Sequence, residues 1–311
     1  MKKNRIINMK YIKNVSYMLL LTVFAFACKS NTTGQEAVEE GPIKISLAQW
    51  SFNKEIKSGE MNNQEFIRKA AEMGFGGVEY VNQFFKDKAD DFIFLDSLDA
   101  VAEEVGVEQL LIMIDGEGSL ADPDQLVRAD AVENHKKWVR AASYLGCHSI
   151  RVNLNGSGTK EEMRDYAVEG LIDIGEYAAE QGVNIIVENH GGYSSNGAWL
   201  ADVIYRVKME NVGTLPDFGN FCEERESGKC TKEYDKYQGV KELLPYAKAV
   251  SAKSHDFDEN GNETTIDFER MISLVKDAGF HGYIGVEYEG NDISAEEGIK
   301  LTKQLIEKHL N

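Results

Sequence analysis

Short apolar runs alternate with longer segments of helical periodicity from residue 43 to the C-terminal end of the chain. The runs are rich in β-branched and aromatic residues and recur eight times, which is typical of strands that alternate with helices. The predicted strands are residues 43–52, 77–81, 109–115, 148–154, 183–190, 212–219, 250–257 and 283–289. Because a helical segment separates each strand from the next, the strands are expected to pair in parallel.

The segments between the strands carry apolar residues at spacings of three and four, as in residues 63–73, 267–278 and 296–309. Four segments end in similar phrases, EMGFGG, YLGCHS, EQGVNI and DAGFHG, in which glycine is expected to end the helix in a left-handed conformation. Eight such units in roughly 270 residues fit a single (β/α)8 TIM barrel of the α/β class. We therefore expect one barrel domain over residues 42–311.

An open doubly wound sheet is the competing fold. It needs a glycine-rich phosphate turn after its first strand. The sequence QWSFNKEIKSG at that place does not resemble such a turn.

The first 27 residues have the pattern of a signal peptide. Five Lys or Arg residues and no acidic residue precede an apolar run over residues 17–27, which is too short to span a bilayer. The run closes with AFAC, which resembles the site at which bacterial lipoprotein precursors are cleaved and lipidated on cysteine, here Cys28. An ordinary cleavage site beside an incidental cysteine is the alternative. Residues 28–41 are polar and acidic, as expected of a flexible tether.

This N-terminal pattern predicts a lipid-anchored lipoprotein outside the cytoplasm, whose membrane contact runs through the anchor only. Outside the cytoplasm, Cys222 and Cys230 could form a disulfide across the short charged loop that they flank. Two free thiols are the alternative, and the sequence does not decide between them.

The chain carries 34 Lys and Arg against 52 Asp and Glu, a formal net charge of -18. A surface this acidic repels a phosphate backbone, so we expect no nucleic-acid partner.

Candidate chemistry gathers at the ends of the last four predicted strands, because the active site of a β/α barrel is built at the carboxyl ends of its strands. These ends carry Glu188, Asp217, His255 and Glu287, and the two-residue period of a strand is consistent with inward projection. Three carboxylates packed together repel one another unless a cation compensates them. Three oxygen ligands and one imidazole suit Mn²⁺, Mg²⁺, Co²⁺ or Zn²⁺.

Each of these residues taken singly also has a simpler interpretation. Glu188 or Glu287 alone is as well explained by a helix cap or an ion pair. His255 alone is as well explained by a hydrogen-bonded histidine of the barrel.

The chain from residue 43 to residue 309 resembles the sugar phosphate isomerase/epimerase group of the xylose-isomerase-like barrels. The likeness is carried by the segments IIVENHGG, PDFGN, AKSHDFDENG and IGVEYEG, which contain the four polar strand ends. The resemblance implies one divalent metal ion held by Glu188, Asp217, His255 and Glu287. It also implies that the two glutamates are catalytic and move a proton at the carbon next to a metal-polarised carbonyl of a small-molecule carbohydrate.

Removal of that proton gives an enediolate, whose fate decides the reaction. Return of a proton to the opposite face epimerises the centre, whereas its return to the neighbouring carbon exchanges aldose and ketose. Loss of a leaving group from the β carbon would make the protein a metal-dependent lyase or hydratase of oxidised (3-keto) glycosides. A non-catalytic barrel that binds sugar at the cell surface is an alternative of a different class.

An endonuclease of abasic DNA shares this barrel and some of its metal ligands. It would require a basic groove and more histidines for a multi-zinc centre than the six of this chain.

The substrate contacts of the ketose 3-epimerases in this group are not inherited. Those relatives have a histidine three residues after the metal aspartate, a glutamate six after the first metal glutamate and an arginine six after the metal histidine. This chain has Asn220, Ser194 and Gly261 at these positions.

Other polar strand ends are the candidates for substrate binding, namely His190, Asn153, Glu79 and Asn220. Lys253 is a further catalytic candidate, which would polarise a substrate oxygen or act as a base with a lowered pKa. An ion pair with Glu287 or Glu289 is the alternative for Lys253. Because the predicted mouth has few cations and the protein is expected outside the cytoplasm, an unphosphorylated sugar or keto sugar is the expected substrate.

Overall fold

The computed structural model describes residues 41–311 of the chain. The predicted signal peptide, Cys28 and the tether up to residue 40 lie outside the described residues. All eight predicted strands are present, and their bounds are β1 Lys44–Ala48, β2 Gly77–Val81, β3 Glu108–Met113, β4 Ser149–Val152, β5 Asn184–Glu188, β6 Val212–Leu215, β9 Val250–Ser254 and β10 Tyr283–Tyr288.

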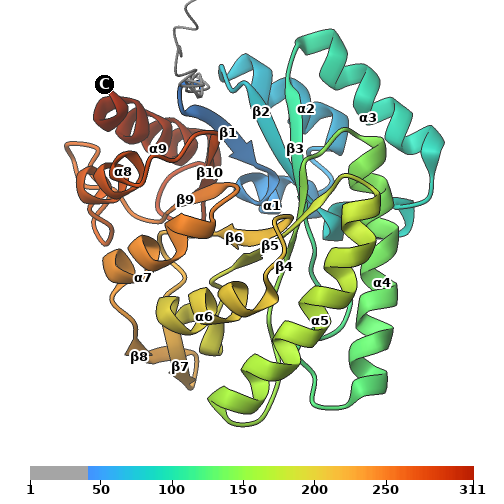
Figure 1. The fold of residues 1–311 in the computed structure, drawn as a ribbon. Helices are drawn as coiled ribbons and strands as arrows, with labels where there is room; N and C mark the ends of the chain where they lie inside the picture. The colour runs from blue at the N-terminus through green and yellow to red at the C-terminus, as the bar shows by residue number, and fades with distance from the viewer. Residues whose placement is uncertain (1–40) are drawn as a thin grey trace, which may run out of the picture. The chain divides into compact units, whose positions relative to one another are not determined.

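These strands form one parallel sheet in the order β6-β5-β4-β3-β2-β1-β10-β9. The two outer strands meet beyond the end of β6, where Asp217 pairs with Ser251. The Ser251 carbonyl accepts from the Phe218 N–H at 3.0 Å, and the Ser251 N–H donates to the Pro216 carbonyl at 2.9 Å. These bonds close the sheet, so the predicted (β/α)8 barrel is confirmed (Figure 1).

Helices surround the strands, as the alternating pattern predicts (Figure 1). Their bounds are α1 Asn53–Ser58, α2 Asn63–Glu72, α3 Phe92–Val105, α4 Gln125–Tyr144, α5 Lys160–Glu180, α6 Gly197–Val207, α7 Lys236–Leu243, α8 Phe268–Asp277 and α9 Ala295–Leu310. Capping boxes begin α2 at Asn62 and α5 at Thr159, each closed by a glutamate three residues later. Each of these helices therefore begins where its sequence satisfies the first free N–H groups.

The glycine phrases end helices in the conformation that the sequence predicts. Gly74, Gly146, Gly182 and Gly279 have φ values of 74°, 71°, 70° and 68°. A left-handed residue at this place turns the chain out of the helix and into the next strand. Glycine takes this conformation without the steric cost that a side chain would bring.

Several local features differ from the sequence expectation. The strands predicted to end at residues 154, 190, 219 and 257 end at Val152, Glu188, Leu215 and Ser254. The first strand ends at Ala48, and Gln49–Phe52 forms a 3₁₀ turn instead of extending the strand. An antiparallel hairpin, β7 Cys222–Glu226 with β8 Lys229–Glu233, follows β6 and was not predicted. A disulfide joins Cys222 to Cys230 across this hairpin, with a Cα–Cα separation of 5.8 Å.

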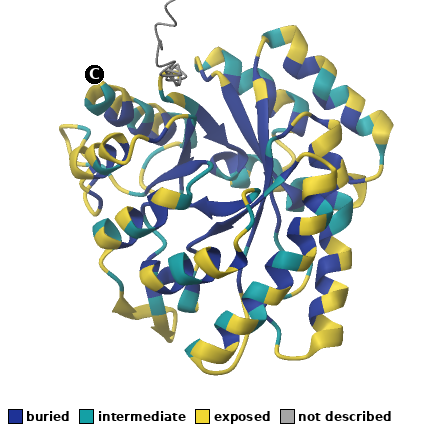
Figure 2. Ribbon diagram, viewed as in Figure 1, coloured by how far each residue is buried: buried dark blue, intermediate teal, exposed yellow. Residues whose placement is uncertain are grey.

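The buried side chains form two apolar clusters, and Figure 2 shows the burial of the strands and of the inner helix faces. The larger cluster packs between the strands and the helices. The smaller cluster includes Leu111, Met113, Ile186 and Leu215, which alternate with residues of the larger cluster along their strands and therefore fill the barrel interior. No helix within residues 41–311 is long and apolar enough to cross a membrane.

Candidate active site

The charged residues of the mouth continue the inward rows of the barrel interior. Two residues after Met113, Ile186 and Leu215 of the interior cluster come Asp115, Glu188 and Asp217. Because side chains two residues apart on a strand point the same way, these charged residues point inward above the apolar residues of the barrel interior.

A cavity of about 440 Å³ opens at this rim. Its polar lining residues are Gln83, Asp115, Arg151, Asn153, Asn155, Glu188, His190, Glu287 and Glu289, and Trp50, Val81, Met113 and Gly116 complete the wall. Four of the predicted site residues thus line one cavity: Glu188, Glu287, His190 and Asn153. The other five predicted site residues within the described chain do not line it: Asp217, Lys253, His255, Glu79 and Asn220.

Arg151 of β4 lies between two carboxylates of the cavity wall. Its Nη1 donates to Asp115 Oδ1 at 2.9 Å and to the Ile114 carbonyl at 3.3 Å. Its Nε forms an ion pair with Glu188 Oε2 at 2.9 Å, although the N–H is not directed at that oxygen. Asn153 also donates to Asp115, at 2.7 Å, so the polar groups after β3, β4 and β5 form one network.

Lys253 of β9 lies among carboxylates from the two neighbouring strands, β10 and β6. Its Nζ donates to Glu287 Oε1 at 2.8 Å and to Glu289 Oε1 at 3.2 Å, and it lies 3.8 Å from Asp217 Oδ2. The alternative of an ion pair with Glu287 or Glu289 is therefore correct, and both glutamates take part. The Lys253 side chain is 2% exposed, so it meets these carboxylates away from solvent.

The contacts of Lys253 favour the charged ammonium over a neutral base with a lowered pKa. Burial alone would lower the pKa of Lys253, but the charges of Asp217, Glu287 and Glu289 outweigh it and hold the pKa well above its ordinary value. Burial alone would raise the pKa of Glu287, and the Lys253 ammonium outweighs it and keeps that pKa below its ordinary range. Lys253 is thus an ammonium ion that keeps its neighbour ionised.

The carboxylate beside Arg151 is governed by the same two opposing effects. Burial would raise the pKa of Asp115, but the Arg151 guanidinium beside it lowers the pKa below its ordinary value. Two buried cations thus offset part of the carboxylate charge of the mouth, a task that the sequence argument gave to a metal ion.

Asp217 is held by its own turn. Its Oδ1 accepts from the N–H groups of Gly219 and Asn220 at 2.8 Å each, and its Oδ2 accepts from Ser251 Oγ at 2.7 Å. Burial raises the pKa of Asp217, and the opposing charge of Lys253 does not cancel that effect. Asn220 Nδ2 donates to Glu188 Oε1 at 2.9 Å, so this candidate substrate contact positions Glu188 instead.

The four residues predicted to ligate a metal do not form one ligand set. Strand β9 ends at Ser254, and the backbone N–H of His255 turns to Glu263 Oε1 at 3.3 Å, so the alternation that would point His255 inward no longer applies. No three His, Cys, Asp or Glu side chains among residues 41–311 are arranged to hold a metal ion. The ammonium of Lys253 lies where Asp217 and Glu287 approach each other, so the predicted divalent ion does not fit these residues.

Glu79 differs from the substrate contact that the sequence predicts. Its side chain is 1% exposed and accepts from Ser46 Oγ at 2.6 Å inside the barrel. Gly285 makes room for this carboxyl, because a Cβ at that position would lie 2.4 Å from Glu79 Oε1. Burial raises the pKa of Glu79 to about 8.

Arg151 and Asp115 line the cavity, although the sequence reasoning did not name them as site residues. The signal was present in the strand period, because Arg151 shares a face with Ser149 and Asn153, and Asp115 ends its predicted strand. What the pattern does not give is the reach of the Arg151 side chain to a carboxylate on each neighbouring strand.

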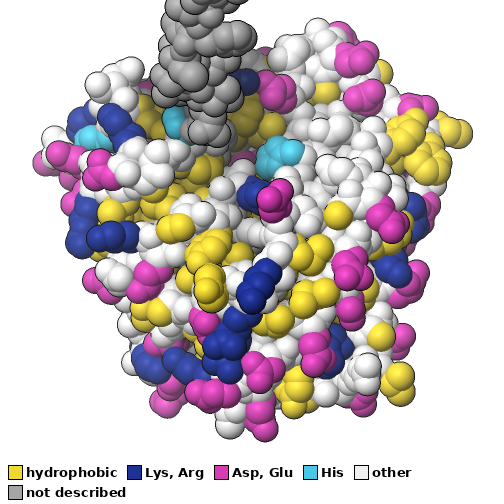
Figure 3. Space-filling model, viewed as in Figure 1, with side chains coloured by type: hydrophobic (Ala, Val, Ile, Leu, Met, Phe, Trp, Pro, Cys, Tyr) yellow, Lys and Arg dark blue, Asp and Glu magenta, His cyan; other side chains and the backbone are white. Residues whose placement is uncertain are grey.

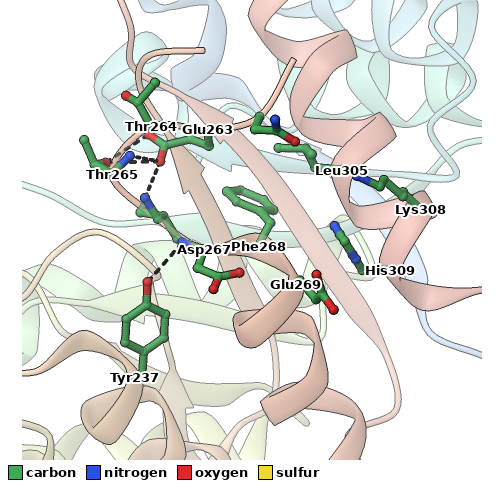
Figure 4. Close-up of a pocket in the computed structure, with 12 residues that line it drawn as sticks. Tyr237, Glu263, Thr264, Thr265, Asp267, Phe268, Glu269, Leu305, Lys308 and His309 are labelled. Carbon is green, nitrogen blue, oxygen red and sulfur yellow. Dashed lines mark hydrogen bonds between the residues drawn. The ribbon is translucent and has the colours of Figure 1, made fainter. Parts of the chain in front are cut away.

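A second cavity of about 430 Å³ adjoins the first, and His190 and Asn155 line both. Its wall includes the glycine-rich turns 156–158 and 191–192 and Glu223 of the unpredicted hairpin. A third hollow of about 400 Å³, shown in Figure 4, lies between residues 262–269 and helices α7 and α9, and none of the predicted site residues lines it. The two adjoining cavities therefore form the candidate site.

On the face shown in Figure 3, acidic side chains are spread over much of the surface, and a group of Lys and Arg in its lower part has acidic side chains beside it. This face shows no broad basic surface of the kind that nucleic-acid binding requires.

The fold and the charged strand ends define a (β/α)8 barrel with its candidate active site at the carboxyl ends of the strands. The chain belongs to the xylose isomerase-like TIM barrel family, whose model matches residues 67–308.

Comparison with known proteins agrees with this family. A 66-residue stretch is 35% identical to the C-glycoside deglycosidase alpha subunit of Arthrobacter globiformis, and it covers 20% of this chain and 19% of that protein. The apo structure of the 3-keto-D-glucoside 4-epimerase YcjR from E. coli has a TM-score of 0.64 and 17% identity over 85% of this chain and 98% of that one. A xylose isomerase-like barrel protein of Mycobacterium smegmatis in complex with magnesium has a TM-score of 0.63 and 17% identity over 86% and 98%. At such identities the likeness to solved structures is one of fold.

Proposed function

We propose that this protein is a sugar isomerase or epimerase that moves a proton at the carbon next to a carbonyl of an unphosphorylated sugar or keto sugar. The observation that carries the proposal is the pair Glu188 and Glu287, which line one cavity from β5 and β10. Both side chains are nearly buried, at 2% and 5% exposure, and each is held by a cation. A carboxylate fixed beside a cavity in this way can accept a proton from a bound ligand.

The lining of the cavity supports an uncharged ligand. Asp115, Glu188, Glu287 and Glu289 give the wall four carboxyl groups, and Arg151 is the only Lys or Arg among the described lining residues. A phosphate would meet more negative than positive charge here. Gln83, Asn153 and His190 offer hydrogen bonds of the kind that sugar hydroxyls make, and Trp50 adds an aromatic side chain to the wall.

Two outcomes follow from one proton transfer. If one glutamate removes the proton and the other returns one from the opposite face, the centre is inverted. If the proton returns to the neighbouring carbon, an aldose and a ketose are exchanged.

Deuterium exchange tests this function directly. We expect candidate keto sugars incubated with the protein in D₂O to gain deuterium at the carbon beside the carbonyl, as followed by NMR. Glu188→Gln and Glu287→Gln keep the shape of each side chain and should each slow exchange by about 10²–10⁴-fold. Lys303→Met, which breaks an exposed ion pair on α9, is the matched control and should exchange like the wild-type protein. Sugar binding without exchange in the wild-type protein would instead favour the non-catalytic barrel.

A second candidate function is elimination from an oxidised glycoside. The adjoining cavity favours it, because His190 and Asn155 connect the carboxylate-lined space to room for a second group. The partial similarity to a C-glycoside deglycosidase subunit points the same way. A chromogenic 3-keto glycoside separates the two functions, since release of the aglycone indicates a lyase and deuterium gain without release indicates an epimerase.

A further inference from the structure

Two buried side chains, Arg151 and Lys253, supply positive charge at the mouth of this barrel. Arg151 is 5% exposed and Lys253 is 2% exposed, and each lies within 3.0 Å of a carboxylate of the cavity wall. These two residues come from β4 and β9, so they approach the site from different parts of the barrel.

Lys253 occupies the space in which a cation would join the carboxylates of β6 and β10. Its stem passes over Gly219, where a Cβ would lie 3.1 Å from Lys253 Cδ. An ammonium group has three donors and no lone pair, so it satisfies Glu287 and Glu289 but does not ligate a metal. A divalent ion at the same place would meet a like charge in a site closed to solvent.

Arg151 has a donor left over for a ligand. Its Nη1 is bonded to Asp115 and to the Ile114 carbonyl, and its Nε lies beside Glu188. Nη2 has no hydrogen-bond partner within residues 41–311 and is open to solvent. The Arg151 side chain lines the cavity. A planar guanidinium with one side fixed by carboxylates presents its remaining N–H groups in a set direction.

We propose that this centre works without a divalent metal ion: Arg151 binds the substrate carbonyl oxygen, and Lys253 is the positioning residue that holds Glu287 at the cavity wall. This inference rests on the proposed function. In the forward step, Glu287 or Glu188 takes the proton, and the C–H electron pair becomes the C=C bond. The carbonyl π pair moves to oxygen, where Arg151 N–H groups stabilise the charge. Return of a proton restores the carbonyl, so the reaction needs no oxidant or reductant.

Metal binding tests the inference without any substrate. The full chain is purified, treated with EDTA and exchanged into metal-free buffer, and MnCl₂ is titrated while the EPR signal of free Mn²⁺ is followed. We expect no stoichiometric site in the wild-type protein. Lys253→His replaces the ammonium by an imidazole, and we expect it to bind one equivalent of Mn²⁺ with the three carboxylates. Lys253→Met is the control that removes the charge without adding an oxygen or nitrogen ligand, and it should bind no such equivalent.

Activity gives the second readout. Exchange by the wild-type protein should be the same with EDTA as with Mn²⁺, Mg²⁺, Co²⁺ or Zn²⁺. Arg151→Met should lower kcat/KM by about 10²–10³-fold, with partial recovery in Arg151→Lys. Lys253→Met should lower kcat by about 10²-fold and change KM little, because Lys253 acts through Glu287 and does not touch the substrate. Recovery in Lys253→Arg would separate this role from a general loss of folding.

A wild-type protein that retains one equivalent of a divalent metal, loses exchange in EDTA and regains it with that metal would overturn the inference. An equal loss of kcat and rise of KM in Lys253→Met would overturn the positioning role. A protein that binds no metal and shows no exchange with any candidate sugar would contradict the proposed function, while the titration would still support a metal-free centre. Failure of the function and failure of the inference are therefore distinguishable.

Discussion

On one side of the barrel mouth Arg151 lies between Asp115 and Glu188, and on the other Lys253 lies between Glu287 and Glu289. We call these the Arg151 side and the Lys253 side. Each places one buried cation among carboxylates, but only Arg151 is itself part of the cavity wall. The difference follows from the side chains, because a guanidinium can hold carboxylates along some of its edges and still present another.

The comparison shows that burial and charge alone do not mark the residue that meets a ligand. Lys253 is the more enclosed and the more strongly compensated cation, with a pKa well above its ordinary value, yet it reaches the cavity only through its partners. A buried ion pair thus places Arg151 in the cavity wall on one side, whereas on the other side Lys253 only holds Glu287 in place.

The largest expected effect is on stability. Lys253→Met should lower the free energy of unfolding by about 4–5 kcal/mol, because it leaves buried carboxylates without their cation. Arg151→Met should cost about 3 kcal/mol, because Asp115 has access to water and Glu188 keeps the hydrogen bond from Asn220. Guanidinium unfolding of the two variants measures the difference. A cost below about 1 kcal/mol for Lys253→Met would break the comparison.

Glu79 sharpens the comparison because the charges of both Glu287 and Glu188 act on it. Its folded-state pKa is about 8 against an ordinary 4.5. Between these values the unfolded chain is ionised while the folded protein keeps its proton, so stability falls as pH rises through this window and is unaffected by Glu79 below it. Glu79→Gln should therefore stabilise the protein by roughly 3 kcal/mol at pH 8 and by little at pH 5.

Unfolding of Glu79→Gln and the wild-type protein at both pH values measures this difference. The same stabilisation at pH 5 as at pH 8 would mean that the Glu79 carboxyl is not held protonated.

A double-mutant cycle tests whether the Lys253 side is one unit. Removing Glu287 together with Lys253, as Lys253→Met with Glu287→Gln, should restore about 1–3 kcal/mol relative to the sum of the single changes. Pairing Lys253→Met with Asp115→Asn, on the other side, is the control and should be additive. Coupling across the mouth would show that the two sides are not independent.

The smallest effects come from single hydrogen bonds on each side. Ser251→Ala removes the Oγ donor to Asp217, and Asn220→Ala removes the Nδ2 donor to Glu188. Each should cost about 1–2 kcal/mol in thermal or chemical unfolding. Only Asn220→Ala should also slow deuterium exchange appreciably, since it alone loosens a carboxylate of the cavity wall, and equal effects on exchange would contradict the assignment of roles.

The fold could be predicted from the sequence because each unit repeats the same sequence pattern. An amphipathic segment ends at a glycine such as Gly146 or Gly279, and an apolar run of strand length follows. The β7–β8 hairpin was missed because its residues are mostly charged and exposed, so no apolar period marks it.

The site could be predicted only as far as strand geometry holds. Glu188 and Glu287 lie within strands, and both reach the cavity as their parity predicts. His255 lies one residue past the end of β9, where parity no longer fixes direction, and Lys253 two residues earlier takes the central place instead. Arg151 depends on the reach of a long side chain to Asp115 and Glu188, and a linear pattern carries no such information.

The absence of a side chain at Gly285 constrains which residue pairs can occupy positions 285 and 79 in related sequences. Any larger residue there would collide with the Glu79 carboxyl, so position 285 is free to grow only where position 79 has shrunk. The two positions should change together across homologues even though neither lines the cavity. A chain with alanine at 285 and a short residue at 79 would lack the buried, protonated carboxyl group. Its stability would then no longer fall at alkaline pH for this reason.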